Sequence, residues 1–573
     1  MRTRGRERGR SGPEAPAPSR ALTPGDWVLV AALFAAAFLP ILLTANDYGA
    51  TYDEPHYVSA GGRYAEWWSL ALHSPAQALN REAIESVWSL NHEHPPLQKV
   101  ASGLSYLWFH DVLPGTASMR LPSALWFALA LCALYLFTRG LWGRGGALFS
   151  ALALATMPRV VADAHFTALD MPVAAWFFIT AALAAKALRD DSWPWTILTG
   201  VAFGLALSSK VNALFLPALL LPWGLLWYRR RWPKLVAALL IGPAVFFAGW
   251  PWLWVAPAAH LREYLAFHLR HAAYNTWYLG KLYQLAPWHY PFVMTAVTTP
   301  TLVLLAAVVG LARCRPRRLM DADQALLLLG LVVSIGPSVL PSSPKYNGVR
   351  LFLPAFPFLA ALAGGGFAWL QARIAALPPL KKPGNARAAA GVALLLGLAL
   401  LAPGMRAVVH THPYQLAYYN ALVGGTSGAT KRGFETIYWG QVLSEAGPFI
   451  NSIKTSNPRV LVIPKGVIYL FDFQTVRPDV RFTGDEAEAA SADCVLFQCM
   501  QSEFSPLCWK LYRGARPVWA VTLDGTPLLV FYDREAVREA LARLARKTAL
   551  VLPASNAAAS RDRKSPTRKV AGS

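Results

Sequence analysis

Two adjacent carboxylates, Asp53 and Glu54, stand shortly after the first long apolar segment of the chain, residues 27–43. A segment of that length can span a bilayer, so the acidic pair is expected at the membrane surface, near the lipid headgroups. A polar reaction on a lipid-borne substrate would have to occur there, and carboxylates are suitable general bases. The same pair also suits the first turn of an amphipathic surface helix, where the helix dipole favours acidic residues. The pair alone leaves both interpretations open.

A second group of polar side chains is the run His92-Glu93-His94, which stands directly before two prolines. Imidazole and carboxylate groups are ligands for zinc and related ions, so these three residues are candidates for a divalent metal. Three consecutive side chains rarely all point at one ion, and contact with a phosphate or an acceptor is the alternative. Simple packing is the third possibility. Metal dependence is left open.

Three later residues precede or begin apolar segments. Asp170 stands before Met171-Pro172, where it can either support a reaction centre or cap a helix. Lys345 and Arg350 precede another apolar segment, and an arginine can contact a phosphate with two parallel hydrogen bonds. Basic side chains at the end of a span also extend to lipid headgroups without a specific ligand.

The composition identifies the class of protein that must position these groups. The chain has 573 residues, of which 55% are hydrophobic and 15% charged, as in a protein that crosses the membrane many times rather than a soluble enzyme. The formal net charge of +22 lies largely in the two tails and in short loops. Positive-inside topology accounts for that distribution, so nucleic acid is not expected as a partner.

Apolar runs predict about eleven membrane-spanning helices, the first of them a retained signal anchor. Lys and Arg gather in alternate loops, which places the N-terminus in the cytoplasm and the C-terminal region outside it. We therefore expect a cytoplasmic tail at 1–25, a membrane domain at 26–407 with an external loop at 45–120, an extracytoplasmic domain at 408–550 and a second tail at 551–573; both tails have the composition of disordered segments. The predicted spans are 27–43, 121–138, 146–162, 171–187, 194–209, 212–228, 235–254, 291–312, 324–340, 351–371 and 388–404.

The parts outside the membrane have patterns of their own. In the first loop, 55–72 and 97–109 are predicted as interfacial helices. The loop 256–290 is rich in His and aromatic residues, which either form an interfacial belt or stack on a sugar. The C-terminal region predicts a small α/β domain with a helix at 441–453, strands at 459–463 and 493–497, and a hairpin at 518–523 and 528–532. Cys499 and Cys508 are the preferred disulfide pair in that domain.

The order and spacing of several motifs resemble the lipid-phosphosugar-dependent GT-C glycosyltransferases, most closely the branch of protein O-mannosyltransferases and aminoarabinose transferases. The fold class implied is an α-helical polytopic membrane protein of the GT-C type. A further block from Tyr418 to Gly440 is similar to prokaryotic members of that superfamily and not to the eukaryotic mannosyltransferases. The motifs that carry the resemblance are Tyr52-Asp53-Glu54, His94-Pro95-Pro96-Leu97, Arg120-Leu121-Pro122-Ser123, Met157-Pro158-Arg159, Asp163-Ala164-His165, Leu169-Asp170-Met171-Pro172 and Tyr346-Asn347-Gly348-Val349-Arg350.

The resemblance implies a reaction and assigns roles to residues. Asp53 is the implied general base, Glu54 orients the acceptor or shares that role, and Asp170 is the second acidic position. The donor is a polyprenyl-phosphate sugar, and the acceptor is a protein, a lipid or a glycan. No glycine-rich nucleotide fingerprint follows a strand, which argues against a nucleotide-sugar enzyme. The implied contacts to donor phosphate or substrate are Glu93, His94, Arg120, Asp163, His165, Lys345 and Arg350, with His94 in place of the lysine of the aminoarabinose branch.

Two other classes of protein compete with this interpretation. A transporter of lipids or glycans would have a similar number of spans, but it should show charged or glycine-broken helices near mid-membrane and often internal repeats, which are not found here. A non-catalytic envelope assembly protein would keep the fold and tolerate the loss of Asp53. The sequence does not identify the sugar or the acceptor.

Overall fold

The computed structural model describes residues 21–270, 274–314, 321–382 and 384–551. Within these ranges, seven helices are long and apolar enough to cross a membrane, and three shorter apolar helices accompany them. The long segments contain α1 (Pro24–Leu43), α6 (Ala117–Ala155), α8 (Asp170–Arg189), α11 (Trp232–Ala248), α16 (Ala322–Ile335), α17 (Ala355–Ala375) and α18 (Ala386–His410); the shorter ones are α9 (Trp193–Leu207), α10 (Leu216–Trp227) with the turn before it, and α15 (Thr301–Arg313).

The helix α6 accounts for two predicted spans, because its backbone leaves the helical region at Gly143, where φ is 70°. All the predicted spans therefore coincide with apolar helices, and the predicted polytopic helical fold is confirmed. How many of these helices cross the membrane stays a prediction. The predicted tails fall almost entirely outside the described residues.

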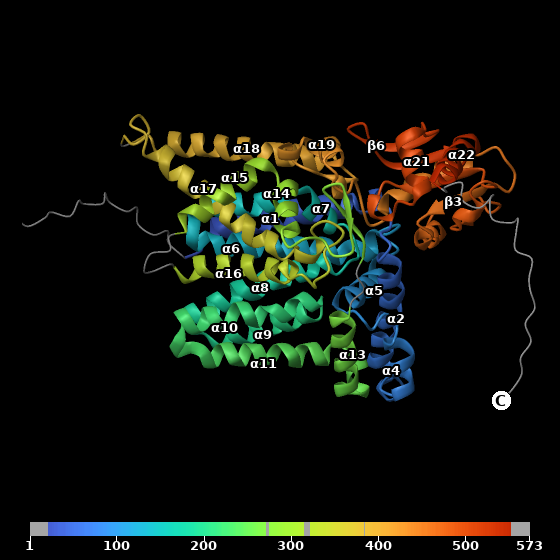
Figure 1. Cartoon of the computed structure of the whole chain (residues 1–573). Helices are drawn as coiled ribbons and strands as arrows, with labels where there is room; N and C mark the ends of the chain where they lie inside the picture. The colour runs from blue at the N-terminus through green and yellow to red at the C-terminus, as the bar shows by residue number, and fades with distance from the viewer. Residues whose placement is uncertain (1–20, 271–273, 315–320, 383, 552–573) are drawn as a thin grey trace, which may run out of the picture.

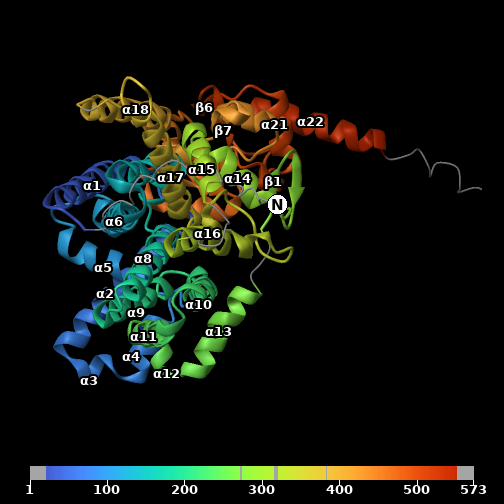
Figure 2. The same cartoon turned by 90° about the vertical axis from the view of Figure 1, so that its left-hand side faces the viewer.

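The long helices form a roughly parallel bundle (Figure 1). Seen from the end, α1, α6 and α17 occupy one part of it and α9, α10 and α11 another (Figure 2). The helices α6, α15 and α17 pack closely through small residues: a Cβ on Gly364 would lie 1.8 Å from the Ser150 hydroxyl, and one on Gly310 would lie 1.9 Å from the Leu362 carbonyl oxygen. Close backbone approach of this kind is how helices associate in a membrane, where burial from water contributes little.

A layer of shorter helices crosses one end of the bundle (Figure 1). It contains α2 (Glu54–His73) and α5 (Leu97–Phe109), as predicted, together with α4 (Arg81–Trp88) and α13 (Pro257–Leu269). Glycines bring α2 and α5 into contact, because a Cβ on Gly103 would lie 2.0 Å from the Gly61 carbonyl oxygen. The loop after α13 forms a short hairpin, β1 (Thr276–Tyr278) with β2 (Lys281–Tyr283), which the sequence did not predict.

The C-terminal domain is a mixed sheet with helices on both faces, and it lies beyond the same end of the bundle (Figure 1). The sheet order is β4-β3-β5-β7-β6, with β3 parallel to β4 and β5, and β7 antiparallel to β5 and β6. The predicted strands are confirmed, and so is the hairpin turn, where Asp524 and Gly525 have φ of 49° and 72°. The elements are α19 (Gly425–Lys431), η8 (Gln441–Glu445), α20 (Ala446–Ser452), β3 (Arg459–Ile463), η9 (Lys465–Phe473), β4 (Arg481–Thr483), β5 (Cys494–Gln498), α21 (Pro506–Gly514), β6 (Trp519–Leu523), β7 (Thr526–Asp533) and α22 (Arg534–Val551).

The two faces of this sheet have separate apolar cores. Alternate side chains of β3, Val460 and Val462, pack with η8 and α20, whereas Leu461 and Ile463 pack with α21 and α22. This alternation is the pattern of a strand buried on both faces. Cys499 and Cys508 lie together in the second core as free thiols, so the predicted disulfide is wrong. Burial raises the pKa of Cys508 to about 12 and that of Cys499 well above its usual value.

Candidate active site

Asp53 immediately precedes α2 and receives two hydrogen bonds on one carboxylate oxygen. Arg350 Nη2 donates to Oδ2 at 2.7 Å, and the indole Nε1 of Trp439 donates to the same atom at 2.8 Å. Within the described part of the chain no hydrogen bond to Oδ1 is found. The side chain keeps 24% of its surface exposed, so this second oxygen can meet a substrate.

Arg350 connects Asp53 to a second carboxylate. It is the first residue of η5 (Arg350–Phe352), and its Nε donates to Asp170 Oδ2 at 3.1 Å. Lys210 Nζ donates to the other oxygen of Asp170 at 2.6 Å. The result is a continuous chain Asp53–Arg350–Asp170–Lys210 drawn from four separate segments. Charge-assisted hydrogen bonds in a buried network fix the orientation of each member, so Asp53 is held in one position.

Trp439 completes this network from the C-terminal region. Its ring lies against the Arg350 guanidinium, with 3.6 Å between the guanidinium carbon and the ring centroid, while its N–H bonds Asp53. The backbone of Trp439 has φ of 78°, which is uncommon and costly for a bulky residue. The bond from Tyr52 N to the Trp439 carbonyl, at 3.0 Å, holds this conformation. Strain of this kind is characteristic of functional sites.

The segment that carries Asp53 is held from two further sides through Tyr52. Asn347 donates to the Tyr52 hydroxyl, and the Tyr469 hydroxyl of η9 donates to the Tyr52 carbonyl oxygen. Burial, and then the neighbouring Asp53, raise the pKa of Tyr52 well above its ordinary value, so this phenol stays neutral. The C-terminal domain therefore contacts the residue next to Asp53 directly.

A second buried polar group adjoins the network. Asp163 ends α7 (Pro158–Asp163), and neither of its carboxylate oxygens has a hydrogen-bond partner among the described residues. Burial, and then the nearby Asp170, raise the pKa of Asp163 well above its usual range. Arg159, also on α7, stacks on Tyr419 at 4.6 Å. A Cβ on Gly348, where φ is 68°, would lie 2.4 Å from Arg159 Nη1, so only glycine fits beside it.

The basic side chains of this region differ in their partners. Arg350 and Lys210 form ion pairs with Asp53 and Asp170, whereas Arg159 forms no ion pair among the described residues. Its Nη1 and Nη2 are buried and have no hydrogen-bond partner in those ranges. A buried guanidinium with unused donors favours an anionic ligand.

Glu54 and Arg120, both predicted as site residues, lie outside the network and pair with each other. The pair is nearly fully buried, with Arg120 Nη2 at 2.7 Å and Nε at 2.9 Å from the two carboxylate oxygens. The other N–H groups of Arg120 bond the carbonyls of Ala45, Tyr48 and Gly49 at 2.6, 2.8 and 3.0 Å. All five donors of the guanidinium are thus in use. This geometry fits a structural clamp between the first loop and α6 better than a contact with donor phosphate.

His165 and Lys345 are also directed elsewhere. His165 bonds Thr44 Oγ1 at 2.9 Å and the Val161 carbonyl at 2.7 Å, and burial lowers its pKa to about 3. Lys345 Nζ donates to two carbonyl oxygens of its own loop, at 2.8 and 2.9 Å, and burial lowers its pKa. Neither side chain reaches the Asp53 network through a hydrogen bond that the structure describes.

The candidate metal residues do not converge. His92 bonds Glu263 at 2.9 Å, Glu93 accepts from Asn91 at 2.7 Å, and the His94 ring packs edge-on against Tyr57. In the part of the chain that the structure describes, no three His, Cys, Asp or Glu side chains are placed to hold one ion. These residues do not fit a metal site.

Three residues in or beside the network were missed as site residues from the sequence: Lys210, Trp439 and Arg159. Each stands in a motif or turn that the sequence does single out, namely the turn between two apolar segments, the Tyr438-Trp439-Gly440 block and the Met157-Pro158-Arg159 motif. For Lys210 and Arg159, the available signal was a basic residue at the end of an apolar segment. Nothing in the local sequence indicates that these groups meet Asp170 or Asp53.

Comparison with known proteins gives one match of sequence. Residues 93–254 match the family model described as dolichyl-phosphate-mannose-protein mannosyltransferase. This match confirms the predicted resemblance to the protein O-mannosyltransferase branch, and it supports a membrane glycosyltransferase. None of the curated proteins compared with the chain matches it significantly.

Solved structures with a similar arrangement were also found. ArnT from Cupriavidus metallidurans, bound to undecaprenyl phosphate, is 18% identical with a TM-score of 0.47, over 89% of this chain and 98% of that one. AglB from Archaeoglobus fulgidus, in complex with an inhibitory peptide and a dolichol-phosphate, is 12% identical with a TM-score of 0.46, over 83% and 70%. The Pmt1-Pmt2 complex of S. cerevisiae, bound to the sugar donor, is 22% identical with a TM-score of 0.28, over 44% and 35%.

Proposed function

Starting from the match to the mannosyltransferase family, we propose that this chain transfers a sugar from a polyprenyl-phosphate donor to a hydroxyl group of an acceptor. The observation that carries the proposal is the position of Asp53. Its Oδ2 is fixed by Arg350 and Trp439, and its Oδ1 is left for a substrate. A carboxylate with one oxygen held and the other accessible is well arranged to take a proton.

The reaction is a displacement at the anomeric carbon. The acceptor oxygen attacks that carbon while Asp53 Oδ1 takes the hydroxyl proton. The bond between the anomeric carbon and the phosphate oxygen breaks, and its electron pair leaves with the lipid phosphate. The family resemblance implies that this displacement is direct and inverts the configuration of the sugar. Because the phosphate leaves with little protonation, cations are needed more than an acid.

The cations beside Asp53 suit the departing phosphate. Arg350 and Lys210 hold Asp170, and Arg159 adds a buried guanidinium that forms no ion pair among the described residues. As negative charge grows on the leaving group, fixed cations in a water-poor site stabilise it with little reorganisation. Asp170 acts as a positioning residue, since its two oxygens hold Arg350 and Lys210 in place.

We place this reaction on the extracytoplasmic face. The support is the distribution of basic loops, which puts the Asp53 segment, the Asp170 turn and the C-terminal domain on the same side. Hydrogen bonds join all three, because Arg350 bonds both Asp53 and Asp170 and Trp439 bonds Asp53. The C-terminal domain lies at one end of the bundle (Figure 1). The identity of the sugar is not part of the proposal.

The test is transfer by the purified protein in lipid nanodiscs. A radiolabelled polyprenyl-phosphate mannose and the corresponding nucleotide sugar are supplied separately, with an envelope extract as acceptor. The proposal expects label to move from the lipid donor into acceptor and not from the nucleotide sugar. Labelled lipid that crosses the bilayer of a proteoliposome without forming a glycosidic bond would instead indicate a transporter. If no lipid-linked hexose, pentose or aminopentose supplies label, the proposal fails.

A further inference from the structure

Glu435 and Thr436, which shortly precede the active-site tryptophan, are bonded to the turn η11 (Gln501–Glu503) that follows β5 in the C-terminal sheet. The Glu435 Oε1 accepts a hydrogen bond from the backbone N–H of Ser502 at 2.9 Å. Thr436 forms a reciprocal pair with Gln501, because its backbone N–H donates to Gln501 Oε1 at 2.9 Å and Gln501 Nε2 donates to its hydroxyl at 2.7 Å. We call these three hydrogen bonds the clamp.

The clamp stands close in the chain to two aromatic side chains of the site. Tyr438 lies against Arg159, with 5.5 Å between the guanidinium carbon and the ring centroid. Trp439 is the next residue, and its indole N–H donates to Asp53. Both rings follow Thr436 almost directly, so a shift of the chain at the clamp would move them together. The clamp therefore joins the C-terminal sheet to the site.

Glu435 is also linked to Arg159 through a second tyrosine. The Tyr419 hydroxyl donates to the Glu435 carbonyl oxygen at 2.8 Å, and the Tyr419 ring lies 4.6 Å from the guanidinium carbon of Arg159. The Arg159 Nε donates to the Tyr418 carbonyl oxygen at 3.1 Å. Residues near both ends of the block from Tyr418 to Gly440 thus hold Arg159. The clamp fixes that block, and with it the cation assigned to the departing phosphate.

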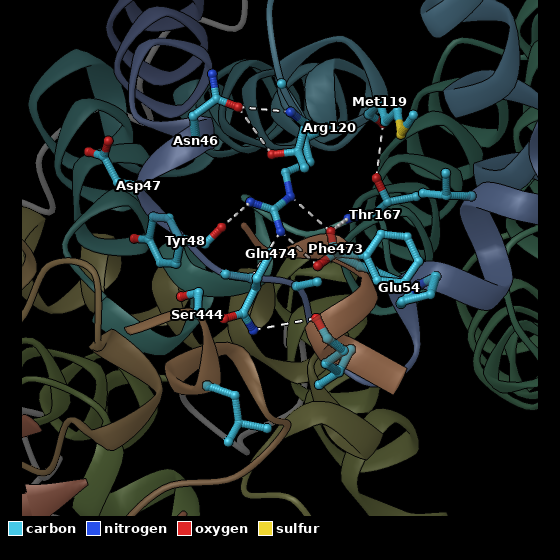
Figure 3. Close-up of a pocket in the computed structure, with 18 of the residues that line it drawn as sticks. Asn46, Asp47, Tyr48, Glu54, Met119, Arg120, Thr167, Ser444, Phe473 and Gln474 are labelled. Carbon is cyan, nitrogen blue, oxygen red and sulfur yellow. Dashed lines mark hydrogen bonds and ion pairs between the residues drawn. The ribbon is translucent and has the colours of Figure 1, made fainter. Parts of the chain in front are cut away.

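Another side of the C-terminal domain faces the first loop across a cavity of about 560 Å³ (Figure 3). The elements η8 and η9 line this cavity together with the end of the first loop's opening turn and the turn before α6. In Figure 3, Asn46 and Arg120 lie above, and Ser444 and Gln474 of the C-terminal domain lie below. Side chains that line a cavity constrain one another less than side chains in contact. We therefore assign the positioning of Trp439 to the clamp.

Glu435 is the titratable member of the clamp, and its side chain is buried. In the described ranges, the charged or titratable groups around it are Glu503 on η11, Arg159 on α7, Tyr419 in its own block and Tyr290 at the start of α14 (Tyr290–Thr298). Burial raises the pKa of Glu435 to about 7 and Glu503 adds to the shift, whereas the Ser502 hydrogen bond and Arg159 oppose it. Relative to the usual value of 4.5 in water, the clamped carboxyl binds its proton about 300-fold more tightly.

We propose that Glu435 is a positioning residue whose proton keeps the clamp closed, and that the closed clamp holds Trp439 and Arg159 in place for transfer. The proposal rests on the proposed function and adds pH regulation of the same site. A neutral Glu435 still accepts the bond from Ser502. An ionised Glu435 places a further negative charge in a buried region beside Glu503, and opening of the clamp returns that charge to water. Transfer should therefore be faster below about pH 7 than above it.

The pH profile of kcat tests the proposal, measured on the purified full-length protein with radiolabelled polyprenyl-phosphate mannose, or with the lipid-linked pentose or aminopentose that supplies label in its place. If only the closed clamp transfers sugar, kcat should be about tenfold lower at pH 8 than at pH 6. Glu435→Gln cannot ionise and keeps an oxygen for Ser502, so its kcat should change less than about twofold over that range. Glu503→Gln removes the neighbouring charge and should move the midpoint to lower pH. Glu488→Gln, an exposed carboxylate of the same domain, is the matched control and should keep the wild-type profile.

Hydrogen–deuterium exchange of residues 434–440 gives a second readout that does not depend on transfer. After correction for the intrinsic exchange rate, protection should fall from pH 6 to pH 8 in the wild type and stay level in Glu435→Gln. Equal kcat profiles for the wild type and Glu435→Gln, or an equal loss of protection in both, would overturn the inference and leave the proposed function intact. If protection changes as expected but no lipid donor supplies label, the proposed function fails, and the role of Glu435 in transfer falls with it.

Discussion

The indole N–H of Trp439 should contribute to catalysis, and one substitution can measure that contribution. Trp439→Phe keeps an aromatic ring over Arg350 and a bulky side chain at this positive-φ position, but it removes the donor to Asp53 Oδ2. A hydrogen bond to a charged group contributes about 1.5–3 kcal/mol, so kcat should fall about ten- to a hundredfold. Because the bond orients the base and does not touch the donor, the KM for the lipid donor should change little.

The assay is transfer from the radiolabelled lipid donor by purified protein, with kcat and KM measured separately. Trp254→Phe is the matched control, since the Trp254 indole also donates one bond, to the Phe247 carbonyl at 2.7 Å, away from Asp53. Trp439→Leu should be slower still, because it also removes the ring against Arg350. An unchanged kcat for Trp439→Phe, or an equal loss in Trp254→Phe, would show that the Trp439 N–H does not orient Asp53 for catalysis.

Three further predictions concern stability. Glu54→Gln leaves the Arg120 charge buried without its partner, so the free energy of unfolding should fall by on the order of 3 kcal/mol or more, and the thermal midpoint with it. Transfer per folded molecule should be largely kept. Loss of transfer at an unchanged midpoint would contradict this prediction. Burial raises the pKa of Glu435 to about 7, above its usual 4.5, so its contribution to the free energy of unfolding is full below about pH 4.5 and is lost as pH rises through about 7. Thermal unfolding measured from about pH 5 to pH 8 should therefore show a decline in stability, by at most on the order of 3 kcal/mol, that Glu435→Gln flattens. Equal slopes of stability against pH for the wild type and Glu435→Gln would disprove this. Cys499 and Cys508 are free, so a thiol titration of the denatured protein should detect both, and a reductant should leave the unfolding midpoint unchanged; a midpoint lowered by reductant would restore the disulfide.

The elements that the sequence predicted well are those set by local pattern. Long apolar runs place the helices, and the interfacial helices α2 and α5 follow from their mixed aromatic and charged faces. In the C-terminal domain, β3 and the Asp524-Gly525 turn were predicted because β-branched runs and left-handed turn residues act locally. The short strand β4 and the irregular η9 have no such pattern, and tertiary packing decides them.

The candidate site was predicted in part for the same reason. Asp53, Asp170 and Arg350 were found through motifs, and the structure joins them in one network. Trp439 lies 386 residues from Asp53 along the chain, and no spacing rule connects the two. Glu54 was assigned to the same site as Asp53 because the two are adjacent carboxylates in the sequence. At the start of a helix, however, consecutive side chains diverge, and Glu54 meets different partners.

The role of Asp53 as general base is best examined by the transfer rate of Asp53→Asn in a single turnover with saturating lipid donor and acceptor. Asparagine keeps the size of the side chain and an oxygen for Trp439, but it cannot take the acceptor proton. We expect the rate to fall at least about a hundredfold, the range that general-base catalysis supplies. Asp111→Asn, an exposed aspartate on the same loop whose side chain is 88% exposed, should match the wild type. A rate for Asp53→Asn close to that of Asp111→Asn would contradict Asp53 as the base.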